Sequence, residues 1–240
     1  MKFWIKLGSV LGLISICFGA FAESPTLTMG VFSWEPYVST NPEHYGVISE
    51  IAITALERTG YKIEVHDYPF SRVMKNLEFG IIDIAPAISP NTERAKTVDF
   101  SSPIYNVEMG FTFKKGRIHY QTISDLKAYT AGVMLGTFWI NELTSAGILY
   151  EGAAEQEQNI RKLILDRVDF VCMPKGVAWH LLTQMGEDPN NYEFGLFKHE
   201  GQPLGISKRT PFKTLREDFE RGLASIKRDG TYDKIVAKYK

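Results

Sequence analysis

The sequence predicts an α/β protein of two lobes, each a mixed sheet flanked by helices. Three observations support this fold class. Residues 27–88 alternate strand-like and helix-like segments in the order β-α-β-α-β, and short turns between them favour a parallel-containing sheet covered by helices. Residues 109–184 repeat this alternation without repeating the sequence. The chain has 240 residues, enough for one large domain or two of modest size.

The first 22 residues form a secretory signal peptide. Lys2 and Lys6 precede an apolar run over residues 7–18, and small residues follow at the positions expected for cleavage after Ala22. The apolar run is too short for a stable transmembrane helix. An uncleaved N-terminal anchor is the alternative. We therefore expect a protein exported to the periplasm.

The elements of the first half follow from apolar spacing. Residues 27–31 predict a strand and residues 61–65 alternate like a half-buried one. Apolar residues at helical spacing begin at Val47, and Gly60 closes that helix. Ser71 is the predicted N-cap of a second helix that ends at Gly80. An apolar run of buried-strand type then begins at Asp83.

The second half is predicted in the same way. The expected strands are residues 109–113, 130–134, 168–173 and 205–208, and the expected helices are a short one at 124–126 and longer ones around 160–165, 176–184, 212–226 and 232–239. Cys172 lies in one of the apolar runs, so it is predicted to be a buried structural thiol.

Arg94 is the sharpest candidate for a binding residue. It lies in a polar loop, broken by Pro90, that follows the strand-like run after Asp83. Ligands of open α/β sheets bind beyond such strand ends, and a guanidinium group pairs bidentately with a carboxylate. We expect Arg94 to anchor a ligand carboxylate, with Ser89 and the turn Gly136–Thr137 as further donors. A surface arginine that caps the turn at Asn91 is the alternative.

Two aromatic residues follow first-half strands. Trp34 and Phe70 each lie in a loop directly after a strand-like run, next to Pro36 and Pro69. Aromatic rings in such loops can form the walls of a small-ligand site and can contact an ammonium group. Covering the core of the lobe is the alternative role.

Composition and motifs argue against several function classes. The net charge is −1, which disfavours a nucleic-acid binder. The five histidines show no metal-ligand spacing, and the sequence contains neither a phosphate-binding Gly-rich loop nor a G-x-S-x-G nucleophile turn. We expect no cofactor and no catalytic site.

Three motifs carry a family resemblance. Residues 92–94 with 98–101, the pair Gly136–Thr137, and residues 227–235 resemble the signatures of solute-binding proteins of polar amino acid ABC transporters, the glutamine-binding type of family 3. The resemblance covers essentially the whole mature chain. It implies the type II periplasmic-binding-protein fold, with lobe one formed by residues 23–108 and 203–240, lobe two by 109–202, and two crossover strands between them.

The same resemblance implies the roles of the site residues. The position matched by Arg94 holds the ligand α-carboxylate with help from that of Ser89, the positions of Trp34 and Phe70 sandwich the ligand, and Thr137 donates from lobe two. The family commonly has an aspartate for the ligand ammonium where this chain has Pro174, followed by Lys175. Glu35 could substitute for it, or the ligand could lack an α-ammonium; Lys175 could favour a second anionic group.

The expected function is capture of a small carboxylate-bearing solute, an amino acid or a related compound. The protein is expected to be a monomer that closes over the ligand by hinge motion and delivers it to a membrane ABC permease. One alternative is a periplasmic enzyme on the same fold, resembling cyclohexadienyl dehydratases, with Glu35 as general acid. Another is a ligand-binding sensor or accessory protein that serves no transporter.

Overall fold

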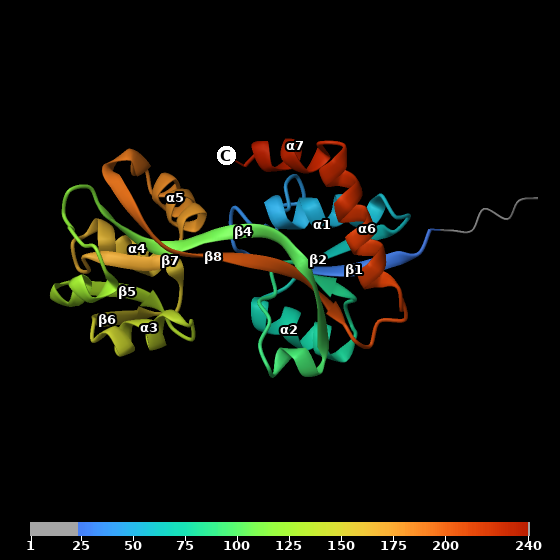
Figure 1. Ribbon diagram of the computed structural model, residues 1–240, viewed down its shortest axis with the longest axis horizontal. Helices are drawn as coiled ribbons and strands as arrows, with labels where there is room; N and C mark the ends of the chain where they lie inside the picture. Colours follow the sequence, from blue (N-terminus) through green and yellow to red (C-terminus); the bar gives the residue numbers. More distant parts are fainter. Residues whose placement is uncertain (1–23, 240) are drawn as a thin grey trace, which may run out of the picture.

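A computed structural model describes residues 24–239, and the predicted signal peptide and its cleavage site lie outside them. The chain forms two bodies side by side, joined by two long strands (Figure 1). Because these strands belong to both bodies, the strands of residues 24–239 share one hydrogen-bonded sheet with the order β2-β1-β3-β8-β4-β7-β5-β6. The prediction of an α/β fold is confirmed.

Lobe one begins with the N-terminal β-α-β-α-β segment. Its elements are β1 (Thr26–Val31), α1 (Val47–Glu57), β2 (Lys62–Asp67), α2 (Phe70–Phe79) and β3 (Ile84–Ala85). Strand β1 pairs in parallel with β2 and with β3. Gly80, with φ +71°, ends α2 in the left-handed conformation that glycine adopts readily.

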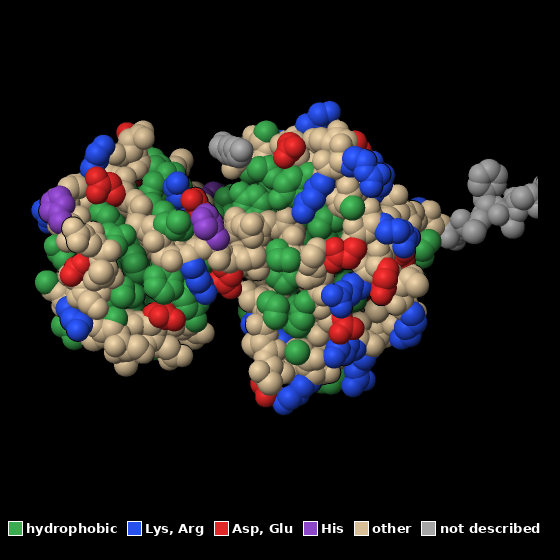
Figure 2. Space-filling view, in the orientation of Figure 1, with side chains coloured by type: hydrophobic (Ala, Val, Ile, Leu, Met, Phe, Trp, Pro, Cys, Tyr) green, Lys and Arg blue, Asp and Glu red, His purple; other side chains and the backbone are tan. Residues whose placement is uncertain are grey.

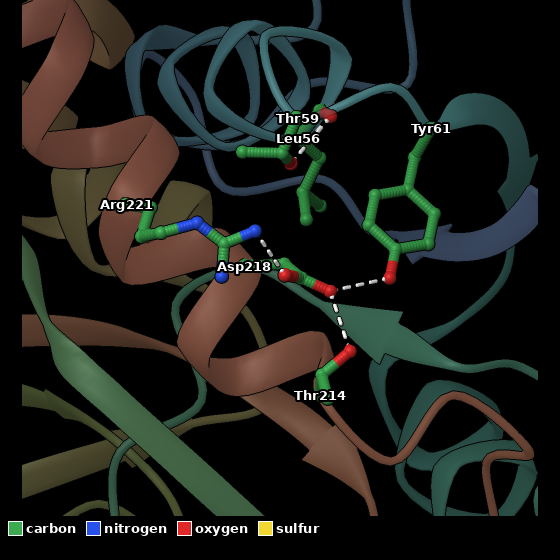
Figure 3. Close-up of polar contacts among 6 residues, drawn as sticks. All are labelled: Leu56, Thr59, Tyr61, Thr214, Asp218 and Arg221. Carbon is green, nitrogen blue, oxygen red and sulfur yellow. Dashed lines mark hydrogen bonds and ion pairs between the residues drawn. The ribbon is translucent and has the colours of Figure 1, made fainter.

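The C-terminus returns to this lobe. Helices α6 (Leu215–Arg228) and α7 (Thr231–Ala237) lie beside α1 (Figure 1). A buried carboxylate, Asp218, fastens α6 to the segment between α1 and β2. It accepts hydrogen bonds from the Tyr61 hydroxyl at 2.7 Å and the Thr214 hydroxyl at 2.8 Å, and it pairs with Arg221 (Figure 3).

Lobe two is the second α/β unit. It contains β5 (Thr130–Met134), α3 (Trp139–Ala146), β6 (Leu149–Ala153), α4 (Gln156–Ile164), β7 (Phe170–Pro174) and α5 (Lys175–Gln184). Strand β5 lies between β6 and β7 and is parallel to both. Apolar side chains on both faces of β5 and β7 are buried, as expected for central strands.

Two strands connect the lobes. β4 (Val98–Lys114) and β8 (Tyr192–Ser207) run antiparallel across the waist of the molecule (Figure 1). Their pairing shifts register near Pro103 and again between Met109 and Gly110. Such irregularities bend a strand pair locally, so they are the natural positions for a hinge.

Three features of the fold differ from the sequence-based expectations. β4 and β8 are far longer than the strands predicted at 109–113 and 205–208, and β6 was missed. Helix α2 starts at Phe70, and Pro69 rather than Ser71 is its N-cap. Proline fits there because the helix needs no N–H group at this position, while its carbonyl accepts the first helical hydrogen bonds, from Arg72 and Val73.

The predicted lobe boundaries, at residues 108–109 and 202–203, fall inside β4 and β8 and remain a prediction. Within residues 24–239, no helix has the length and apolar character needed to span a bilayer.

Candidate functional site

A cleft of about 1020 Å³ lies between the lobes. Figure 2 shows the two bodies separated by a furrow at the waist. Lobe one contributes the loop after β1, the start of α2 and the loop after β3. Lobe two contributes the turn after β5 and parts of α4 and α5, and β8 crosses the cleft between them. Seven of the eight predicted site residues line it: Trp34, Glu35, Phe70, Ser89, Arg94, Gly136 and Thr137.

Arg94 is held in place by its own loop. Its backbone N–H donates to Asn91 Oδ1 at 2.8 Å, and its Nη1 donates to the Ser89 carbonyl at 2.7 Å. The side chain thus bonds a carbonyl of its own loop, at Ser89 rather than in the turn at Asn91, and it also lines the cleft. The guanidinium carbon lies 5.5 Å from the centre of the Phe70 ring. Among residues 24–239, no carboxylate forms an ion pair with Arg94.

Partial burial of this unpaired cation has an electrostatic consequence. Desolvation lowers the pKa of Arg94 from its ordinary value, although arginine stays charged at neutral pH. A buried charge without a counterion is costly, and an incoming anion would relieve that cost. The arrangement suits the carboxylate of a ligand, which would accept hydrogen bonds from the remaining N–H groups of the guanidinium group.

The two aromatic residues lie on the lobe-one side of the cleft. Phe70 is 39% exposed and packs edge-on against Phe32, with 4.9 Å between the ring centres. Trp34 is half-buried and packs against Tyr37, also with 4.9 Å between the centres. Each ring therefore has one part fixed by its neighbour and another part that lines the cleft. Such rings can contact the apolar or cationic part of a ligand.

The lobe-two wall includes the predicted Gly136–Thr137 turn. Gly136 has φ +79°, and a Cβ placed there would meet nothing within 4 Å, so the backbone is open to the cleft. The Thr137 hydroxyl donates to the Met134 carbonyl at 2.7 Å. Next to it, Phe138 stacks on Trp139, with 4.6 Å between ring centres, and both line the cleft.

Lys175 does not belong to the cleft. Pro174 lines the cavity, but Lys175, the first residue of α5, is not among the lining residues. Its ammonium group lies 3.4 Å from Glu108 Oε2 and 5.7 Å from the centre of the Phe194 ring. Lys175 is thus the one predicted site residue that does not line the cleft.

Three cleft residues on β8 were not predicted from the sequence. Lys198, Glu200 and Gln202 alternate along the strand, so they share the face that lines the cleft. Ser89 Oγ lies 3.2 Å from Glu200 Oε1 and 3.4 Å from Gln202 Oε1. Polar residues at a spacing of two were the available signal, but the stretch lacks the apolar alternation that identifies a strand.

A second, smaller cavity of about 320 Å³ lies on lobe two, away from the cleft. Two of its three basic side chains are already paired: Lys114 Nζ lies 2.9 Å from Asp166 Oδ1, and Arg117 contacts the same oxygen at 3.7 Å. It is a weaker candidate for a ligand site. Within residues 24–239, no group of three or more His, Cys, Asp or Glu side chains could hold a metal ion.

Comparison with known proteins agrees with this geometry. The sequence profile of the bacterial extracellular solute-binding proteins, family 3, matches residues 27–240. A probable histidine-binding protein of Campylobacter jejuni is 29% identical over 198 residues, which cover 80% of this chain and 74% of that protein. An L-arginine-binding protein of Pseudomonas aeruginosa is 25% identical over 254 residues and is matched over 96% of its length.

A solved structure supports the same fold. An ancestral arginine-binding protein bound to arginine superposes with a TM-score of 0.72 at 25% identity, covering 90% of this chain and 99% of the other. The predicted two-lobed α/β fold is confirmed by this match and by the strand order.

Proposed function

This chain belongs to the bacterial extracellular solute-binding proteins, family 3, and we propose that it captures a polar amino acid in the cleft between its lobes for uptake through a membrane ABC permease. The resemblance stated from residues 92–101, 136–137 and 227–235 is confirmed at the level of the family. The proposed ligand class follows the relatives named for histidine and arginine binding.

One observation carries the proposal: Arg94 presents a half-buried guanidinium group in the cleft, and no carboxylate among the described residues pairs with it. Ser89 and Gln202 add polar atoms beside it, and Trp34 and Phe70 add aromatic surface. A ligand that bridges Arg94 in lobe one and the Thr137 turn in lobe two would hold the lobes closed, with bending at the irregular pairing of β4 and β8.

The remaining assignments follow from this role. We propose that the mature protein is a periplasmic monomer, with cleavage after Ala22, that it needs no cofactor, and that it releases its ligand unchanged. An enzyme that resembles cyclohexadienyl dehydratase would instead consume prephenate or arogenate. A sensor would bind the same ligand, but deleting the protein would leave uptake of that ligand intact.

A ligand screen tests the proposal. Thermal unfolding of the mature protein is followed with L-arginine, L-histidine, L-glutamine, L-glutamate, succinate and putrescine, and hits are measured by calorimetry. A ligand at 100 times its Kd adds about 2.7 kcal/mol of stability, which shifts the Tm by roughly 5–10 °C for a chain of this size. Binding of none of the amino acids, or loss of prephenate or arogenate on incubation, would refute the proposal.

A further inference from the structure

An α-amino acid brings two charges into the cleft. Arg94 accounts for the carboxylate, but the ammonium group also needs an acceptor, because a cation removed from water without a partner is strongly unfavourable. Position 174, the last residue of β7, offers only a proline ring. The acceptor must therefore come from another cleft carboxylate if the proposed function is correct, and the following inference rests on that function.

Four carboxylates line the cleft: Glu35, Glu155, Glu157 and Glu200. Glu157 already pairs with Arg161 at 2.7 Å and is exposed, and Glu155 is exposed at the start of α4. Glu35 is half-buried in the aromatic loop, and no hydrogen bond connects it to the Arg94 loop among the described residues. Glu200 alone is joined to the residue that holds the guanidinium group.

Ser89 is the link between the two charges. Its carbonyl accepts from Arg94 Nη1 at 2.7 Å, and its hydroxyl donates to Glu200 Oε1 at 3.2 Å. A cation and a carboxylate therefore lie on opposite sides of a single residue. Two opposite charges bonded to the same residue suit a ligand whose own carboxylate and ammonium groups are attached to one carbon atom.

The second oxygen of Glu200 is poised to accept a hydrogen bond. Glu200 Oε2 is buried and has no hydrogen-bond partner among the described residues. Lys198 Nζ lies 3.2 Å from it, close enough for an ion pair but not aligned as a hydrogen bond. The same Nζ lies 4.0 Å from the centre of the Phe138 ring, and the lysine side chain is 42% exposed. Lys198 can thus leave Glu200 and keep a favourable contact with the ring.

We propose that Glu200, on the crossover strand β8, accepts the α-ammonium group of the ligand, and that Lys198 takes the place of this group in the empty cleft. The ammonium acceptor is then part of the crossover strand about which the lobes move, close to the predicted boundary at residues 202–203. Both head groups of the ligand would be bound by Arg94 and this strand before closure, and the Thr137 turn would add its contacts afterwards.

The test compares amino acids with their counterparts that lack the α-amino group. Calorimetry measures L-arginine against 5-guanidinopentanoate, L-histidine against imidazole-propionate, and L-glutamine against 4-carbamoylbutanoate. The wild type should prefer the bound amino acid by 100-fold or more. Glu200→Gln keeps the side-chain size and an oxygen that accepts from the Ser89 hydroxyl. It should raise the Kd for the amino acid by about 30- to 100-fold and change the Kd for the des-amino compound little.

Matched variants separate the possible outcomes. Glu35→Gln and Glu155→Gln should keep the preference, and Lys198→Met should strengthen amino acid binding severalfold because a competitor is removed. If Glu200→Gln keeps the preference, or Lys198→Met weakens binding, the Glu200 assignment is wrong while the proposed function stands. A wild type that binds the des-amino compounds as tightly as the amino acids also overturns the Glu200 assignment. A wild type that binds none of the amino acids overturns both.

Discussion

Replacing Arg94 by alanine should remove most of the affinity for the ligand. The side chain is half-buried in the cleft, and only one of its five N–H groups donates to another described residue, the Ser89 carbonyl. A carboxylate bound by the free side of the fork makes two charge-assisted hydrogen bonds. Because the cleft is partly open to water, the loss should be about 2–4 kcal/mol, equivalent to roughly 30- to 1,000-fold in Kd.

Calorimetry with the tightest amino acid of the screen measures this loss. Arg94→Lys keeps the positive charge but not the pair of parallel N–H donors, so it should recover only part of the affinity that Arg94→Ala loses. Arg216→Ala, an exposed arginine on α6, should bind like the wild type. The melting temperature of each ligand-free variant controls for unfolding. If folded Arg94→Ala binds the ligand as tightly as the wild type, Arg94 is not the carboxylate anchor.

Three further predictions concern stability and reactivity. Tyr61→Phe removes the 2.7 Å hydrogen bond to buried Asp218 and should lower the free energy of unfolding by about 1 kcal/mol in urea titrations. Burial and this bond raise the pKa of Tyr61 from its ordinary value of 10.0 to about 12. The unfolded chain therefore loses this proton at a lower pH than the folded protein, and the wild type should lose more stability between pH 10 and 12 than the variant does. Gly222→Ala should cost about 1–3 kcal/mol or more, because a Cβ there would lie 1.9 Å from the Ala55 carbonyl oxygen. Cys172, 2% exposed and with its pKa raised by burial, should react with a thiol reagent only after denaturation.

Each of these has a result that would contradict it. Unchanged stability and alkaline behaviour in Tyr61→Phe would mean that its contact with Asp218 contributes nothing. Gly222→Ala as stable as the control Ser225→Ala would mean that α6 and α1 are not packed as closely as described. Rapid labelling of Cys172 in the native mature protein would show that β7 opens readily.

The residues of the candidate site were predictable where they follow a recognisable strand end. Arg94 and Ser89 follow an apolar run, and Trp34 and Phe70 follow strands of the same lobe, so sequence order alone brought them to one edge of the sheet. Lys175 does not line the cleft although Pro174 does, because adjacent residues at a helix start need not share a face.

The middle of β8 was not predictable by the same method. Only its last six residues form a continuous buried run, whereas Lys198 and His199 are exposed. A strand that crosses between two lobes has no core on either face at the crossing, so the hydrophobic periodicity that identifies strands is absent. The cleft-facing Glu200 therefore left no signal stronger than a polar residue every second position.

The late position of β8 in the chain also has a consequence for how the protein is made. Strand β3 pairs on one side with β1, but its other partner is β8, and Ile84 meets Ile206 across more than a hundred intervening residues. The packing of α1 against α6 closes a loop of similar length. Contacts so distant in sequence slow folding, because the chain must close a large loop before they form. The N-terminal lobe is thus begun first and completed last, when the final strand and helices of the chain are available.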